Sequence, residues 1–235
     1  MLGLFSVESL MAMLLSVPGV IFAFTMKGFG QALVSKWLGD PTPEDNGRLT
    51  MNPLAHIDWI GLVCMAVFGF GWTKPMPTNS RYYKIYKRDT VLYSLSGSMT
   101  LVLVSFIMAF FHVLFLNLTY RAAETVVGNV FYYITLVFYY AQRYPLILAL
   151  FYLLPLPGLD GYKIITTFTP YKWNTFLYKV ERYSMFIFLG FILLMRFTVI
   201  GDYIFYPAIK LSELFNLFWQ MPLGFISGST LTGAL

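Results

Sequence analysis

The sequence predicts an all-α membrane protein in which a bundle of helices crosses the bilayer several times. Hydrophobic residues make up 58% of the 235-residue chain and charged residues only 11%, whereas a soluble domain carries about 25% charged residues. Mean hydropathy is correspondingly high, at +0.67. Several apolar stretches also approach or exceed the roughly 20 residues that a helix needs to cross a bilayer. These observations exclude a disordered chain, a coiled coil and a soluble globular domain.

Four apolar stretches predict spanning helices, at about 10–38, 91–118, 129–156 and 183–206. A fifth stretch, 54–70, is shorter and predicts either a short span or a segment that enters and leaves on the same side. We therefore expect one transmembrane domain over residues 1–206, followed by an amphipathic or interfacial tail at 207–235. The single cysteine, Cys64, excludes an internal disulfide.

Basic residues gather in the loops between these stretches. The densest group lies in the loop at 71–89 and consists of Lys74, Arg81, Lys84, Lys87 and Arg88. The positive-inside rule predicts that this loop faces the cytoplasm, together with the loops at 40–53 and 157–182. Tyrosines between cations can indicate a nucleic-acid site, but beside a membrane the same pattern favours anionic lipid headgroups as the partner. Because the first 26 residues contain no Lys or Arg, we expect no cleaved signal peptide. This absence and the low cysteine count fit a multi-pass protein of a bacterial cytoplasmic membrane.

Three motifs carry a resemblance to a known family. They are Lys27-Gly28-Phe29-Gly30-Gln31-Ala32, the long run from Gly47-Arg48-Leu49-Thr50 through Asn52-Pro53-Leu54-Ala55-His56-Ile57-Asp58 to Gly71-Trp72-Thr73-Lys74-Pro75, and Leu154-Pro155-Leu156-Pro157-Gly158-Leu159-Asp160-Gly161. This pattern resembles the site-2 protease family of intramembrane zinc metallopeptidases, in its compact bacterial form without a PDZ domain. The resemblance covers about residues 10–200. It implies a site-2 protease-like helical core with a small edge strand.

The resemblance also shows where the chemistry of the family has changed. The family binds zinc through a His-Glu-x-x-His motif, whose Glu activates water, and through an Asp that supplies the third ligand. The motif falls on Lys27, Gly28 and Gln31, and the third ligand falls on Asp160. A cation and a neutral amide cannot replace the two histidine ligands of zinc, and a glycine has no side chain to activate water. The family's Phe-Asn before the Leu-Leu-Pro turn is also changed, to Phe151-Tyr152. We therefore expect no zinc cofactor and no catalytic residues, which describes a pseudoprotease.

Lys27 then gains a structural role. Without a metal ion, Asp160 would be an unpaired carboxylate inside the membrane, which is energetically costly. A lysine at the first ligand position can neutralise this carboxylate, so we expect an ion pair between Lys27 and Asp160. His56 is expected to be a loop histidine hydrogen-bonded to the backbone.

The function predicted from these residues is binding or scaffolding of a transmembrane client in the former substrate groove, at Gly69, Gly71, Trp72 and Lys74. Two alternatives remain open. One is an active metallopeptidase that recruits His56, Asp58 and Asp160 as metal ligands. The other is a small transporter, suggested by four ionisable residues in or near apolar stretches, Lys27, Arg143, Asp160 and Arg196. The sequence leaves the oligomeric state open.

Overall fold

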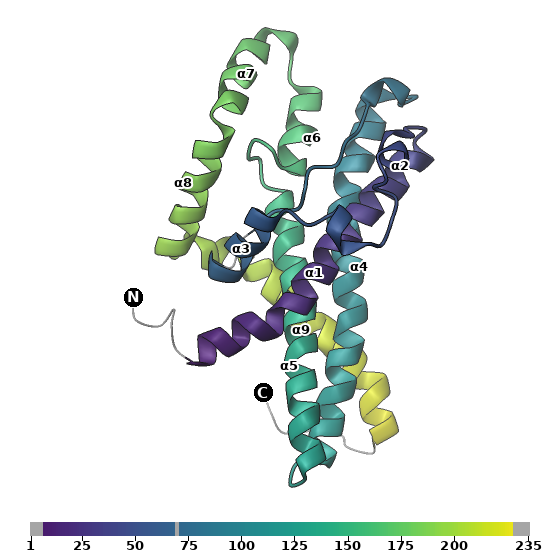
Figure 1. Cartoon of the computed structure of the whole chain (residues 1–235), viewed down its shortest axis with the longest axis vertical. Helices are drawn as coiled ribbons and strands as arrows, with labels where there is room; N and C mark the ends of the chain where they lie inside the picture. Colours follow the sequence, from purple (N-terminus) through teal and green to yellow (C-terminus); the bar gives the residue numbers. More distant parts are fainter. Residues whose placement is uncertain (1–6, 69–70, 228–235) are drawn as a thin grey trace.

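The computed structural model describes residues 7–68 and 71–227, and 79% of the chain is helical. Three helices of the described part are long and apolar enough to cross a membrane. They belong to α1 (Val7–Trp37), α4 (Tyr86–Arg121) and α5 (Val126–Tyr152) (Figure 1). The prediction of an all-α membrane protein is confirmed.

Shorter elements complete the described chain. The further α-helices are α2 (Thr42–Asp45), α3 (Trp59–Phe68), α6 (Asp160–Phe168), α7 (Asn174–Arg182), α8 (Ser184–Phe197) and α9 (Ile200–Ser227). Single turns of 3₁₀ helix lie at Pro53–Ala55, Ser80–Tyr82 and Tyr171–Trp173. Figure 1 shows α6, α7 and α8 as a separate arm beside the α1, α4 and α5 bundle.

Helices α4 and α5 form an antiparallel pair at the centre of the bundle. Thr125 caps the start of α5, because its side chain accepts a hydrogen bond from the backbone N–H of Gly128. Serine hydroxyls of α4 donate to backbone carbonyls of α5, from Ser98 to Ala149 at 3.0 Å and from Ser105 to Gln142 at 2.7 Å. Such small polar residues let two membrane helices approach closely.

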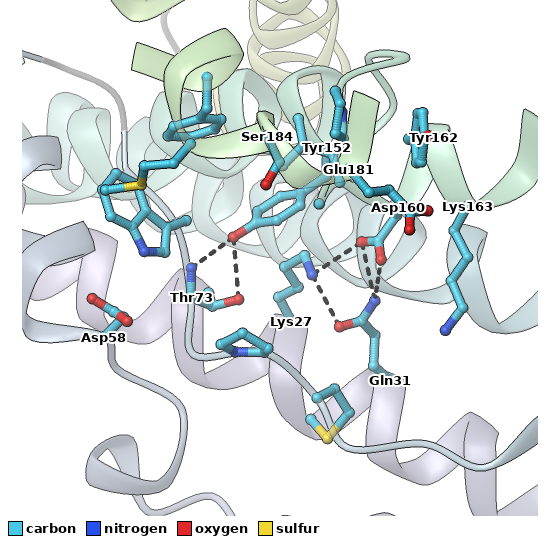
Figure 2. Close-up of a pocket in the computed structure, with 18 of the residues that line it drawn as sticks. Lys27, Gln31, Asp58, Thr73, Tyr152, Asp160, Tyr162, Lys163, Glu181 and Ser184 are labelled. Atoms are coloured by element: carbon cyan, nitrogen blue, oxygen red, sulfur yellow. Dashed lines mark hydrogen bonds and ion pairs between the residues drawn. The ribbon is translucent and has the colours of Figure 1, made fainter. Parts of the chain in front are cut away.

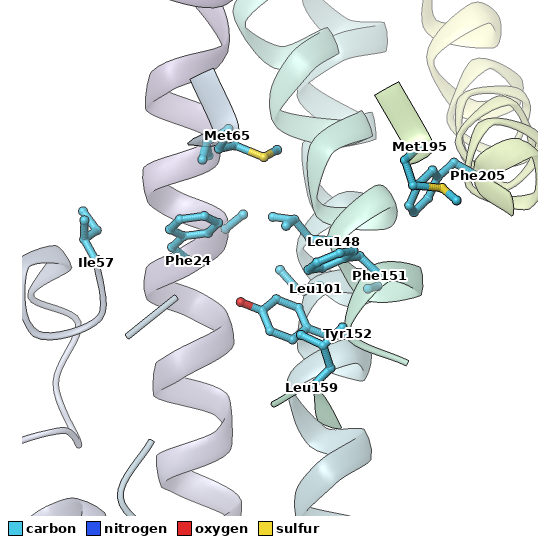
Figure 3. Packing of buried hydrophobic residues seen from close by; sticks show 13 residues of the cluster. Phe24, Ile57, Met65, Leu101, Leu148, Phe151, Tyr152, Leu159, Met195 and Phe205 are labelled. Atoms are coloured by element: carbon cyan, nitrogen blue, oxygen red, sulfur yellow. The ribbon is translucent and has the colours of Figure 1, made fainter. Parts of the chain in front are cut away.

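The hydrophobic core lies where α1 crosses this pair. Phe24 of α1, Leu101 of α4 and Leu148 and Phe151 of α5 are almost fully buried there (Figure 3). Met195 of α8 belongs to the same cluster. The core therefore holds the C-terminal end of α5 against α1, and this end of α5 leads directly into the turn that carries Asp160.

The structure divides the predicted span at 183–206 into two helices. Helix α8 has 14 residues and ends at Phe197, and α9 begins at Ile200. The predicted domain boundary at 206–207 therefore falls inside α9. In the described part of the predicted tail, Trp219 donates a hydrogen bond to the carbonyl of Phe106 in α4 at 3.0 Å. Helix α9 packs its aromatic face against α4. An apolar helix face that packs on protein has the same sequence pattern as one that faces lipid, so the sequence alone does not distinguish the two.

The stretch at 54–70 is a loop that returns on itself. An antiparallel bridge joins Ile57 inside this stretch to Thr73, which follows it, and α3 has only 10 residues. The predicted edge strand does not form in the described residues, which contain this isolated bridge but no strand. The Thr73 N–H, which could have paired with a neighbouring strand, donates to the hydroxyl of Tyr152 at 2.7 Å instead. Gly69 and Phe70 lie outside the described residues.

Candidate functional site

Helix α1 and the start of α6 bring three predicted site residues together. Lys27 and Gln31 lie four residues apart on α1, so they share one face of the helix. Each of the two residues is only 3% exposed. Asp160 is the first residue of α6. The turn before it depends on Gly158, whose φ of +91° lies in the left-handed region that favours glycine. This turn directs the Asp160 carboxylate toward α1.

Lys27, Gln31 and Asp160 form a closed polar network (Figure 2). The Lys27 ammonium lies 3.1 Å from Oδ2 of Asp160 and donates to Oε1 of Gln31 at 2.9 Å. The Gln31 amide nitrogen lies 3.1 Å and 3.0 Å from the two carboxylate oxygens of Asp160. Each of the three side chains therefore contacts the other two, and the expected pairing of Lys27 with Asp160 is present in the structure.

Tyr152 completes the surroundings of Lys27. The Lys27 ammonium lies 3.7 Å from the centre of the Tyr152 ring, a cation–π arrangement that further stabilises a desolvated charge. The Tyr152 hydroxyl accepts from the Thr73 N–H and donates to the Thr73 hydroxyl at 3.1 Å. Sequence reasoning assigned Tyr152 no role. The signal that could have found it is the departure from the family's Phe-Asn pair at this position.

Gly28 lies directly against His56. A Cβ atom built on Gly28 would be 2.1 Å from Nδ1 of His56, so the histidine ring fills the space that a side chain at position 28 needs. His56 is fully buried, and its Nε2 lies 2.8 Å from the carbonyl oxygen of Thr50. Because a carbonyl only accepts, Nε2 is the protonated nitrogen. Burial lowers the pKa of His56, while the bond to Thr50 opposes this shift, which favours the neutral ring.

A cavity of about 730 Å³ opens beside this network. Lys27, Gln31 and Asp160 form part of its wall, and α3, α6, α7 and α8 supply other parts. Trp72 and Phe188 provide an apolar surface, with their rings edge to face and 5.1 Å apart between centroids. The volume is large enough for several side chains of a bound segment.

The predicted groove residues occupy different environments. Trp72 lines the cavity. Gly71 is buried against the backbone of Gly61, and Lys74 is exposed while its backbone N–H donates to the carbonyl of His56 at 2.9 Å. Gly69 lies outside the described residues. Of the described groove residues, Trp72 is therefore the one placed to contact a ligand in the cavity.

The residues of the metallopeptidase alternative do not come together. Asp58 accepts a hydrogen bond from the Gly61 N–H at 2.9 Å and thereby caps α3, while His56 faces Gly28. Among the residues that the structure describes, no three His, Cys, Asp or Glu side chains form a group that could hold a metal ion. An ammonium, an amide and one carboxylate do not fit zinc, because the ammonium has no lone pair and repels the ion.

The transporter alternative rests on four residues that are also dispersed. Lys27 and Asp160 are paired with each other. The Arg143 guanidinium contacts its neighbour on α5, Tyr139, by a hydrogen bond and by stacking over the ring. The side chain of Arg196 lies outside the described part of the chain. The described ionisable groups therefore do not form a continuous polar path.

The fold and the site define a class of protein: a helical membrane protein with a large open cavity and a largely buried lysine–carboxylate network in its wall. The chain is 33% identical over 208 residues to a protein of Bacillus subtilis (strain 168) named "Putative zinc metalloprotease YwhC", and the match covers 86% of this chain and 90% of the relative. This protein therefore belongs to the metalloprotease family of that relative. No family model matches the chain, and no solved structure matches it.

Proposed function

We propose that this protein is a pseudoprotease of the site-2 protease type, which binds a membrane client without cutting it. The observation that carries the proposal is the Lys27 ammonium 3.1 Å from the Asp160 carboxylate. The resemblance assigns zinc ligands to positions 27, 31 and 160. In this chain the same three positions satisfy one another's hydrogen bonds, so the charge of Asp160 is already neutralised by protein.

The position of the catalytic base supports the same proposal. The resemblance assigns the base to position 28, which is glycine here, and the adjacent space is occupied by His56. A side chain at position 28 would therefore need the loop at 50–57 to move. We propose that neither zinc nor a general base operates at this site.

The cavity supplies the binding part of the proposal. Ile60 of α3 and Met185 of α8 both line it and are 66% and 68% exposed, so its rim is apolar and open. In a protein with membrane-spanning helices, an apolar rim suits a hydrophobic segment that arrives from the bilayer. We therefore propose a transmembrane segment of another protein as the client.

Site-specific photo-crosslinking tests client binding. Trp72, which lines the cavity, is replaced by p-benzoylphenylalanine in the full chain, and Tyr132, an exposed aromatic residue of α5, is replaced in a control. We expect intact membrane proteins to be crosslinked from position 72 and not from position 132. Equal crosslinking from both positions, or cleaved clients in the position 72 sample, would contradict the proposal.

We further propose that the basic end of the molecule lies at the cytoplasmic face of a bacterial inner membrane and contacts anionic lipid headgroups. Figure 1 shows α2, the N-terminal end of α4 and the α6–α7 connection at the same end of the molecule. This arrangement gathers the three basic loops. Lys87 joins two of them, because its ammonium lies 5.7 Å from the centre of the Phe168 ring.

A further inference from the structure

A second lysine lines the cavity, and the network around Lys27 does not include it. Lys163 lies on α6, one turn after Asp160. Its ammonium lies 3.3 Å from the hydroxyl of Thr78 and 4.4 Å from the centre of the Tyr93 ring. Figure 2 shows its side chain directed away from the Lys27–Asp160 pair. Both of its polar contacts are with uncharged groups.

None of the described carboxylates that line the cavity forms an ion pair with Lys163. Asp160 is held by Lys27 and by Gln31. Asp58 caps α3 through the Gly61 N–H. Glu181 lies on α7 and is exposed. Among the described residues, Lys163 forms no ion pair with any of the three.

An unpaired cation in the wall of a cavity favours an anionic ligand. Burial lowers the pKa of Lys163, and the carboxylates of Asp160 and Asp40 oppose this shift, although neither forms an ion pair with the ammonium among the described residues. Removing a charge from water costs free energy unless a partner compensates it. A carboxylate placed beside Lys163 recovers this cost and forms a charge-assisted hydrogen bond.

We infer that the client segment carries an acidic side chain that pairs with Lys163 while its apolar side chains lie against Trp72 and Phe188. This inference rests on the proposed function and adds the chemistry of the partner. The contact between Lys163 and Thr78 places the cation beside the segment that follows Trp72. One bound segment therefore meets the apolar surface and the cation in the same cavity.

Binding of two matched peptides to the purified full-length protein in detergent tests the inference. The probes are fluorescently labelled peptides with the sequence Leu-Ala-Leu-Glu-Leu-Ala-Leu and with Gln in place of Glu, and the measurement is fluorescence anisotropy. We expect the Glu peptide to bind at least about tenfold more tightly than the Gln peptide, as charge-assisted hydrogen bonds do. This preference should vanish in Lys163→Met.

Two further variants keep the test decisive. Lys163→Arg retains the cation and should retain the preference, and Lys172→Met removes an exposed lysine next to α7 and should leave it unchanged. Equal binding of both peptides to the wild-type protein would overturn the acidic-client inference and leave client binding intact. Failure of both peptides to bind would contradict the proposed function itself, and the inference with it.

Discussion

Lys27 compensates the charge of a carboxylate, Asp160, and under the proposed function it does so in place of a metal ion. A lysine inside a membrane helix is expensive unless its charge is compensated. Here the ammonium is compensated three times, by Asp160 at 3.1 Å, by Gln31 at 2.9 Å and by the ring of Tyr152 at 3.7 Å. Removing either Lys27 or Asp160 alone leaves the other charge buried without its partner.

Lys27→Met should therefore destabilise the protein strongly. We expect the free energy of unfolding to fall by about 3–5 kcal/mol, the usual cost of breaking a buried ion pair. Denaturant unfolding of the purified protein, followed by circular dichroism, measures the change. The matched control is Lys36→Met on the same helix, where the exposed pair with Glu44 contributes at most about 1 kcal/mol. A loss in Lys27→Met no larger than that in the control would contradict this account of the network.

Part of this site could be predicted from single residues. The motif positions of Lys27 and Asp160 were enough to expect their contact, because two ligands of one ion must converge. The role of Tyr152 could not be predicted in this way. It depends on how the end of α5 packs against α1 and Thr73, and this packing involves residues 79 positions apart in the sequence.

At the scale of elements, the site depends on how closely the loop at 50–57 approaches α1. His56 packs on the backbone of Gly28 with no room for a Cβ atom between them. The bond from Nε2 to Thr50 ties the ring to its own loop. Glycine at position 28 thus allows this close packing, and under the proposed function it also leaves the site without a catalytic base.

Gly28→Ala tests this contact. The added methyl group forces His56 to move, and overpacking of this kind costs about 1–3 kcal/mol. Gly190→Ala is the control, because Gly190 lies in helix α8 with nothing within 4 Å of its added Cβ. Thermal unfolding should show destabilisation for position 28 only. The loss should also shrink when Gly28→Ala is made in a His56→Ala background, and an undiminished loss there would show that the ring is not the obstacle.

The boundaries of α8 and α9 show that a hydropathy pattern does not predict where one helix ends and the next begins. The apolar run continues across Thr198, where the chain turns, so hydropathy alone predicts one span. The aromatic residues of α9 contact α4, as in the pairs of Phe106 with Phe215 and Trp219. Whether an apolar helix faces lipid or protein is decided by the partner surface, which the sequence of the helix does not contain.

At the scale of the whole molecule, the basic loops and the cavity belong to one half of the protein. The opposite end of the α4–α5 pair is the short connection at 122–125. If the basic half lies at the cytoplasmic face, as we propose from the positive-inside rule, this connection should face the other side of the membrane.

Cysteine labelling in bacterial spheroplasts tests this orientation. Cys64 is the single cysteine of the chain, so Cys64→Ser provides a clean background. In this background, Ala123→Cys should react with a membrane-impermeant maleimide in intact spheroplasts. Tyr171→Cys, in the exposed connection between α6 and α7, should react only after the membrane is permeabilised. The reverse pattern would contradict the proposed topology.

The zinc content of the purified wild-type protein tests the central claim most directly. Metal analysis of the protein by mass spectrometry, after incubation with zinc, should find far less than one zinc ion per chain, because Lys27 and Gln31 already bind the Asp160 carboxylate. The Lys27→His, Gln31→His double variant serves as the comparison and should gain zinc, since it restores two histidines four residues apart beside a carboxylate. One zinc ion per wild-type chain that is lost in Asp160→Ala would contradict the account.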